Sequence, residues 1–429
     1  MSQLKIQKLN LRFYPPGLTV VLNDNGETKT ENIELPPLSV LTDLHVLAEK
    51  IVSTYEFFNT KHTKKIEAAL NQILDMQTID YSDFQLQHMH QMHAMPLSDC
   101  SFNKMGDMFV TSSYDHTACV WNTETGEQIA KFVGHTLPVY SCCFNNPYGT
   151  LVATGSFDKT AAIWSVAENK LVYRLGGQSS TDGHTKEVVT VAFDPDSQYV
   201  ATGSMDSKAK IWDVQTGQLL QSLEEHTGEI VSVQFHPSEP LLLTSSFDKT
   251  ARLWDIRTGD CISALRGHKR ETCAAYFNSA GTNIVTGSLD STVRVWDVRQ
   301  ALAIHVLKGH TSEVVAVAYS LDGSKVASSS IDKTARVWST TTGECIAICE
   351  GHTDEVGKVT FNPQGTKVLT ASDDFTCRIW DVNTGRELEC LSGHQDYVTT
   401  CAFNYSGDRI ITASKDNTVR EWRAMKTEH

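Results

Sequence analysis

The sequence predicts a mostly β fold, an eight-bladed β-propeller behind a small N-terminal α+β domain. Two observations carry this prediction. All 8 tryptophans fall into one periodic series with spacings between 42 and 48 residues. Residues before the series carry no repeat and change from β-rich to helical patterns. Because a period of about 40–45 residues with a Trp-Asp signature is the length of a four-stranded blade, eight copies predict a closed ring.

Each repeat also carries polar residues at fixed distances from its tryptophan. A histidine opens the repeat, an aspartate lies six residues before the tryptophan, and a serine lies two residues before that aspartate. This pattern resembles the WD-repeat family over roughly residues 83–423, and the resemblance implies a hydrogen-bonded network of these residues in each blade. Blades 2, 4 and 6 contribute His135, Ser156, Asp158 and Trp164; His226, Ser246, Asp248 and Trp254; and His310, Ser330, Asp332 and Trp338.

The extent of the repeat sets the expected domain boundaries. Residues 1–82 form the small α+β domain, residues 83–423 the propeller, and residues 424–429 a tail. The segment near 84–87 precedes the first histidine as the outermost strand of a blade would. We therefore expect this strand to complete the eighth blade and close the ring, which removes an open sheet edge.

The elements of the N-terminal domain follow from local patterns. The run Leu9–Leu22 is apolar and β-rich, with a Pro-Pro-Gly interruption, and a turn signal at 23–26 leads to Thr28–Leu35, which alternates like a returning strand. A helical pattern opens at Asp43, and a second helix runs from about Thr60 to Met76. The domain is small for independent stability, so we expect it to pack on the propeller.

Composition and motifs argue against several classes of function. The formal net charge of −14 disfavours binding to nucleic acids or anionic membranes, and there is no apolar run long enough for a membrane span and no secretory signal pattern. The 11 cysteines contain no CxxC pair, so reduced thiols are expected. His88, His90 and His93 alone have a spacing that suggests a metal, but His93 belongs to the repeat, so we expect no metal and no cofactor.

The recurring serine, histidine and aspartate are not expected to be catalytic. A catalytic triad occurs once, at a cleft with an oxyanion hole, whereas this set recurs in every blade. The sequence holds no GxSxG, HExxH or Walker motif. We therefore predict a protein that binds other proteins and is not an enzyme.

Two groups of residues are candidates for binding a partner. The residue before each turn aspartate is large and apolar in six of the eight repeats, at Tyr114, Phe157, Met205, Phe247, Leu289 and Ile331. Clustered exposed apolar groups usually mark a binding surface, although packing between blades is the alternative. The second group lies on the outer face of the second predicted helix, at Lys61, Lys64 and Lys65, with ordinary solvated surface as the alternative.

A charge pattern predicts ion pairs in five blades. Glu187, Glu229, Glu271, Glu313 and Glu355 lie three residues after the blade histidine, and Lys210, Arg252, Arg294, Arg336 and Arg378 lie two residues before the tryptophan of the same blades. Blades 1 and 2 lack both members, and blade 8 has Tyr397 and Arg420. We therefore expect pairs near the inner rim, and we expect blades 8, 1 and 2 with the N-terminal domain to line a cleft for a partner. The insertion near 176–183 is interpreted as a loop.

Further sequence segments resemble one particular group of WD-repeat proteins. The run LRFYPPG before two helical patterns, with FNNPYG at 144–149, GSFDKT at 155–160, FNPQG at 361–365 and FNYSGD at 403–408, resembles the family of dynein assembly factors with WD repeats, also called outer row dynein assembly proteins. That resemblance implies a monomeric cargo adaptor. Its partners would be a subunit of intraflagellar transport complex B and the outer-arm dynein complex. It would work in the cytoplasm, at the ciliary or flagellar base and in the axoneme.

One alternative function comes from a short motif. The phrases Trp254-Asp255-Ile256-Arg257 and Trp296-Asp297-Val298-Arg299 resemble the WDxR box of cullin-4 adaptors, which would make the chain a substrate receptor of a ubiquitin ligase. A generic protein-interaction scaffold is a third interpretation. Co-purification with the linker protein of cullin-4 would distinguish the ubiquitin-ligase function from the dynein function.

Overall fold

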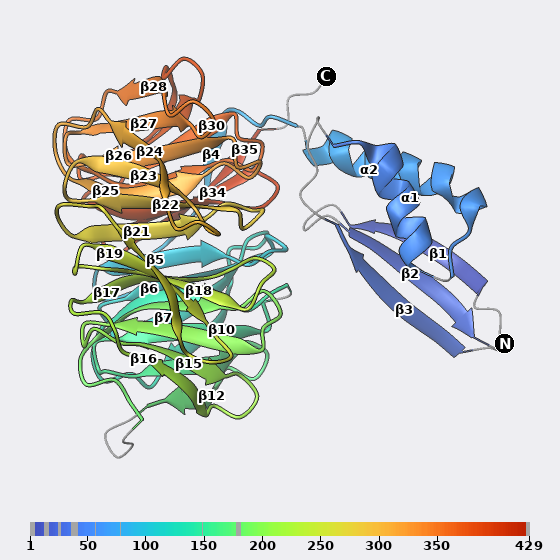
Figure 1. Ribbon diagram of the computed structural model, residues 1–429, viewed down its shortest axis with the longest axis horizontal. Helices are drawn as coiled ribbons and strands as arrows, with labels where there is room; N and C mark the ends of the chain where they lie inside the picture. Colours follow the sequence, from blue (N-terminus) through green and yellow to red (C-terminus); the bar gives the residue numbers. More distant parts are fainter. Residues whose placement is uncertain are drawn as a thin grey trace. The chain divides into compact units, whose positions relative to one another are not determined.

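A computed structural model describes residues 5–12, 17–24, 27–35, 42–55, 57–77, 79–147, 149–176 and 182–425. The chain divides into two compact units, Met1–Asp80 and Tyr81–His429. The first unit is a three-stranded sheet with helices on one face, and the second consists of many stacked β-sheets (Figure 1). Both parts of the predicted fold class, a mostly β propeller of eight blades and a small α+β domain, are confirmed.

The first unit is an antiparallel sheet in the order β1-β2-β3 with two helices. Its elements are β1 (Lys5–Arg12), β2 (Gly17–Asp24), β3 (Glu27–Glu34), α1 (Leu44–Thr54), the 3-10 turn η1 (Thr60–His62) and α2 (Thr63–Gln77). The Asp43 side chain caps α1 by accepting from the backbone N–H groups of His45 and Val46. The second helix thus begins as a 3-10 turn where an α-helix was predicted. The prolines of the Pro-Pro-Gly run lie outside the described residues.

Alternation and helical periodicity build the core of the first unit. Leu18, Val20 and Leu22 alternate along β2 toward the helices, and all three are buried. Ile66 and Ile73 of α2 are also fully buried in the same cluster. Sheet and helices therefore share one small apolar core.

The second unit consists of eight four-stranded antiparallel sheets. The first strands of the sheets contact one another around a ring; they are β5 (Leu97–Phe102), β9 (Val139–Phe144), β13 (Val188–Phe193), β17 (Ile230–Phe235), β21 (Thr272–Phe277), β25 (Val314–Tyr319), β29 (Val356–Phe361) and β33 (Val398–Phe403). The second strands are β6 (Met108–Ser113), β10 (Leu151–Ser156), β14 (Tyr199–Ser204), β18 (Leu241–Ser246), β22 (Asn283–Ser288), β26 (Lys325–Ser330), β30 (Lys367–Ser372) and β34 (Arg409–Ser414).

The third and outermost strands complete the blades. The third strands carry the tryptophans; they are β7 (Thr117–Asn122), β11 (Ala161–Ser165), β15 (Ala209–Asp213), β19 (Thr250–Asp255), β23 (Thr292–Asp297), β27 (Thr334–Ser339), β31 (Cys377–Asp381) and β35 (Val419–Ala424). The outermost strands are β8 (Gln128–Val133), β12 (Lys170–Leu175), β16 (Leu219–Leu223), β20 (Cys261–Arg266), β24 (Ala303–Lys308), β28 (Cys345–Glu350), β32 (Glu387–Leu391) and β4 (Phe84–His90). Of the insertion near 176–183, residues 177–181 lie outside the described residues.

The eighth blade is built from both ends of the propeller sequence. β4 pairs antiparallel with β35, with Phe84 opposite Ala424 and His90 opposite Val419. The other three strands of this blade, β33, β34 and β35, come more than 300 residues later in the chain. The pairing therefore closes the ring and leaves β4 as the outer edge of blade 8.

A charged network marks the seam between blade 8 and blade 1. The Arg409 Nη1 atom lies 2.6 Å from Glu421 Oε1 and also donates to the backbone carbonyl of Thr123. Arg409 further contacts Glu124, which is 3.2 Å from Arg423. Glu421 is fully buried at a position that is apolar in the other seven blades. The seam thus combines apolar packing with buried charge.

Candidate functional site

One hydrogen-bonded chain recurs in all eight blades. The histidine Nδ1 lies 2.6–3.0 Å from a carboxylate oxygen of the turn aspartate. The histidine Nε2 lies 2.7–3.0 Å from a hydroxyl of the second strand. The tryptophan Nε1–H donates to that same hydroxyl over 2.8–3.1 Å. Each blade is therefore joined from its third strand to its turn.

The partners determine where the protons lie. Since a carboxylate only accepts, Nδ1 of His135 donates to Asp158, and its Nε2 then accepts from the Thr154 hydroxyl. In blade 3, burial lowers the pKa of His184 even though Asp206 opposes the shift, so the ring is neutral. Burial alone would raise the pKa of Asp206, but hydrogen bonds from His184 and from backbone N–H groups lower it to about 2. The ionised aspartate and neutral histidine suit a structural role.

The sequence patterns considered above did not identify the hydroxyl that joins histidine to tryptophan. It belongs to Thr111, Thr154, Thr202, Thr244, Thr286, Ser328, Thr370 and Thr412. The predicted serine has a different role, because Ser156 donates to the Leu137 carbonyl and accepts from the Asp158 backbone N–H, which holds the turn in place. A threonine or serine two residues before that serine recurs eight times, so the repeat contained the missing signal.

The turns place the six apolar candidates on one face of the propeller, which we call the turn face. In every blade the backbone N–H of the residue before the turn aspartate donates to the carbonyl three residues after the blade histidine, over 2.8–3.0 Å. These residues therefore lie beside the start of the innermost strand. Met205, Leu289 and Ile331 are half-buried there, and Phe247 is 39% exposed.

Only two of the six candidates are brought together as a ring pair. Tyr114 and Phe157 of blades 1 and 2 contact edge to face at 6.2 Å, and Tyr140 stacks on Phe157 at 5.4 Å. Tyr140 was not a candidate, yet it is 40% exposed, and Leu137, three residues before it in the sequence, is 46% exposed. We call Tyr114, Leu137, Tyr140 and Phe157 the aromatic patch. It breaks the eightfold regularity of the turn face.

The predicted ion pairs are wrong. Within the described residues, none of the five pairs comes within 4.0 Å; Arg252 instead contacts Glu225, and Arg378 lies 2.5 Å from Glu387. The cations belong to third strands and the acids to the start of innermost strands, with the second strand between them. The acids remain at the turn face, where Arg270 lies 2.8 Å from Glu313.

The structure offers no metal centre among the residues it describes. No group of three or more histidine, cysteine, aspartate or glutamate side chains there could hold a metal ion. The rings of His88 and His90 lie 5.9 Å apart on β4, whereas His93 is occupied by Asp115 and Thr111. No described helix is long and apolar enough to cross a membrane.

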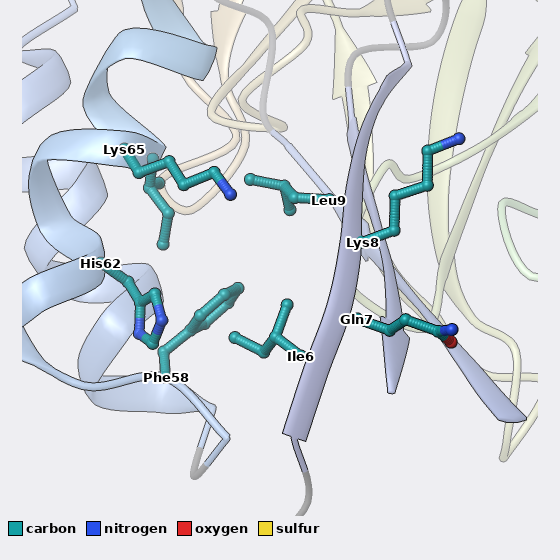
Figure 2. Close-up of a pocket in the computed structure, with 8 residues that line it drawn as sticks. Ile6, Gln7, Lys8, Leu9, Phe58, His62 and Lys65 are labelled. Atoms are coloured by element: carbon teal, nitrogen blue, oxygen red, sulfur yellow. The ribbon is translucent and has the colours of Figure 1, made fainter. Parts of the chain in front are cut away.

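The first unit contains a pocket of about 110 Å³ between β1 and the helical segment, which we call the N-terminal pocket. Figure 2 shows Ile6 and Leu9 pointing from β1 toward Phe58 and His62, whereas Gln7 and Lys8 point away. A bulge between Ile6 and Lys8 shifts the register of β1 against β2. Because of this bulge, two residues three positions apart lie on the same face.

The structure separates the three lysine candidates. Lys65 lines the N-terminal pocket and reaches across it toward Leu9 (Figure 2). Lys61 and Lys64 are exposed and do not line the pocket. His62, which the sequence did not single out, lies at the pocket with its ring 5.8 Å from that of Phe58.

Comparison with known proteins places the second unit in a family of repeats. The family model for the WD domain, G-beta repeat, matches residues 84–122, 126–165, 177–213, 217–255, 259–297, 302–339, 343–381 and 385–423. Each match spans the three inner strands of one blade, and every match except 177–213 begins with the outermost strand of the neighbouring blade. The crystal structure of the computationally designed Ika8 protein is also similar, with a TM-score of 0.68, 28% identity and coverage of 79% of this chain and 98% of that one.

Several curated relatives carry one name. "Dynein assembly factor with WD repeat domains 1" is 42% identical in Mus musculus and 41% identical in Homo sapiens over 144 residues. The protein of that name in Danio rerio is 41% identical over 143 residues. Each match covers 33% of this chain and 34% of the relative, so the chain matches about a third of the length of these curated relatives.

Proposed function

The chain belongs to the WD40 family of WD-domain, G-beta repeats, and on that premise we propose that it is a non-enzymatic adaptor in dynein assembly. In this proposal it is a monomer that links outer-arm dynein to complex B of intraflagellar transport. It acts in the cytoplasm, at the ciliary or flagellar base and in the axoneme. The names of the relatives support the dynein part of this proposal.

The aromatic patch is the observation that supports an adaptor most directly. The polar residues of each blade are occupied by one another, which leaves them unavailable for catalysis. Tyr140 and Leu137 by contrast are exposed, and they gather with Tyr114 and Phe157 on one face. Because aromatic anchors dominate the energetics of protein interfaces, the aromatic patch is the surface that we propose for the partner.

Affinity purification tests this proposal. We expect the tagged chain, purified from ciliated cells, to recover outer-arm dynein chains and intraflagellar transport subunits. The variant Y114A/Y140A/F157A should lose at least one of these groups, because it removes the aromatic anchors. The matched control is L220A/I262A, which truncates two exposed residues of the outer strands β16 and β20 and should recover both groups.

Two outcomes would contradict the proposal. Recovery of cullin-4 components without dynein or transport subunits would favour the ubiquitin-ligase function, in which the exposed Arg257 would serve as the contact. Equal recovery by the patch variant and the control would remove the aromatic patch as the binding surface. Thermal unfolding of each variant would show that the ring itself is intact.

A further inference from the structure

The N-terminal pocket has an apolar floor that the described residues of the first unit leave open. Ile6, Leu9, Phe58 and Ile66 line it, and Ile66 is fully buried at its base. A volume of about 110 Å³ is of the order that takes a small apolar group, since an apolar cavity of about 150 Å³ can bind benzene. The pocket therefore fits one aliphatic side chain supplied from outside.

Hydrogen-bond donors lie around this apolar floor. The Asn59 backbone N–H donates to His62 Nδ1 over 3.1 Å, which leaves Nε2 as the nitrogen of this ring that can donate. Lys65 extends across the pocket toward Leu9 (Figure 2), and among the described residues no carboxylate forms an ion pair with its ammonium group within 4.0 Å. A cation and an N–H donor beside an apolar floor are complementary to a carboxylate next to an aliphatic group.

The strand beside the pocket can receive an extended chain. Within the described residues, β1 pairs with β2 on one side only, so it forms an edge of the sheet. The outer backbone groups of an edge strand are available to another segment. A passing segment in extended conformation could therefore lie along β1 and direct alternate side chains to the pocket.

From these observations we propose that the N-terminal pocket binds a short extended segment of a partner protein in which a leucine-like side chain stands next to an acidic one. The apolar side chain occupies the space between Ile6, Leu9 and Phe58. The carboxylate contacts Lys65 and His62. The pocket belongs to the first unit and the aromatic patch to the second, and the proposal does not depend on the assignment to dynein assembly.

Methyl NMR of the full chain with labelled isoleucine δ1 groups tests the proposal, because Ile6 and Ile66 line the pocket. The probe is Ac-Leu-Asp-NH2, and its matched neutral control is Ac-Leu-Asn-NH2. We expect saturable shifts of both methyl groups with a dissociation constant of about 1 mM, and binding about 5-fold weaker for the control. The methyl group of Ile73, which lies in the core, reports that the fold is unchanged.

Variants of two neighbouring lysines distinguish binding at the pocket from a general attraction of the acidic probe to positive surface charge. K65M should weaken binding of Ac-Leu-Asp-NH2 about 5-fold and leave Ac-Leu-Asn-NH2 unaffected. K64M, one residue away and outside the pocket, should change neither. Three results would each overturn the proposal. The first is equal binding of the two probes, and the second is an equal effect of K64M and K65M. The third is no shift of the Ile6 and Ile66 methyl groups at a probe concentration about 20-fold above the expected dissociation constant. Binding of N-acetyl-leucine more tightly than Ac-Leu-Asp-NH2 would also overturn it, because the pocket would then recognise the C-terminal carboxylate of a partner and not an acidic side chain.

Discussion

At the scale of the residue, one shared hydroxyl determines the geometry of each blade. Thr154 accepts from Trp164 and donates to His135, and His135 in turn donates to Asp158. All donors in this chain point toward the ionised carboxylate. Because Trp164, Thr154 and His135 are buried and the Asp158 side chain is nearly so, each depends on the next for its hydrogen bond.

Loss of the shared hydroxyl should therefore cost more than an ordinary surface change. We expect T154V to lower the free energy of unfolding by about 2–3 kcal/mol, because the indole N–H and the imidazole nitrogen both lose a buried partner. Urea unfolding monitored by tryptophan fluorescence would measure it. T136V, at an exposed threonine of the same blade, is the matched control and should change stability by less than about 0.5 kcal/mol. Equal midpoints for the two variants would contradict this role of the hydroxyl.

The residue scale also shows where prediction from sequence stops. Histidine, aspartate and tryptophan were found because they recur with large, distinctive side chains. Thr154 recurs as regularly but was overlooked in runs of small residues such as Ala153 to Ser156. The predicted pairing of Arg252 with Glu229 is wrong because periodicity shows only that the two positions recur together in each repeat. It does not report which strand separates them.

At the scale of the element, β4 is the strand on which the ring depends. It supplies the outer strand of blade 8, and its first residue, Phe84, is buried against Phe403 with ring centroids 6.0 Å apart. Leu86 on the same strand is 45% exposed. One strand thus carries both an anchor and a solvent-facing position.

This difference in burial predicts that shortening the two side chains to alanine has unequal effects on the stability of the propeller. F84A should destabilise the propeller by about 3–5 kcal/mol, because it removes a buried ring and leaves a cavity. L86A should change stability by no more than about 0.5 kcal/mol. Thermal unfolding of both variants would measure the difference. The role of Phe84 as an anchor would be refuted by similar melting temperatures.

The first unit shows a second limit at the scale of the element. Strand and helix types were predictable there from alternation and from the stripe of Ile66, Leu70 and Ile73. The N-terminal pocket was not, because strict alternation places Ile6 and Lys8 on one face and Leu9 on the other. The bulge after Ile6 reverses that assignment, and no turn residue announces it.

At the scale of the whole molecule, the seam between blades 8 and 1 differs from the other seams. Burial raises the pKa of Glu421 to about 7, although Arg409 opposes the shift. His90 Nε2 lies 4.0 Å from the second carboxylate oxygen. Blade 1 carries Met108 and Val120 at the positions of Arg409 and Glu421, so the fold accommodates an apolar pair at this place.

A double-mutant cycle at the seam tests whether the two charges depend on each other. R409M should lower the free energy of unfolding by about 1–3 kcal/mol, because the buried Glu421 carboxyl loses a hydrogen-bond partner and takes up a proton. R409M/E421V, which copies the apolar pair of blade 1, should recover most of that loss. The coupling energy from urea unfolding of the two single variants and the double variant measures this. Additive losses would mean that the charges contribute independently.

The closure of the ring by β4 has a consequence for the order of events during synthesis. The ribosome produces β4 about 330 residues before its partner strand β35. At about 5–20 residues per second, the segment waits about 15–70 s without its neighbour. Throughout that interval the growing chain is an open arc with unfinished ends. A nascent polypeptide of this design therefore needs protection from association with other chains until its last blade is translated.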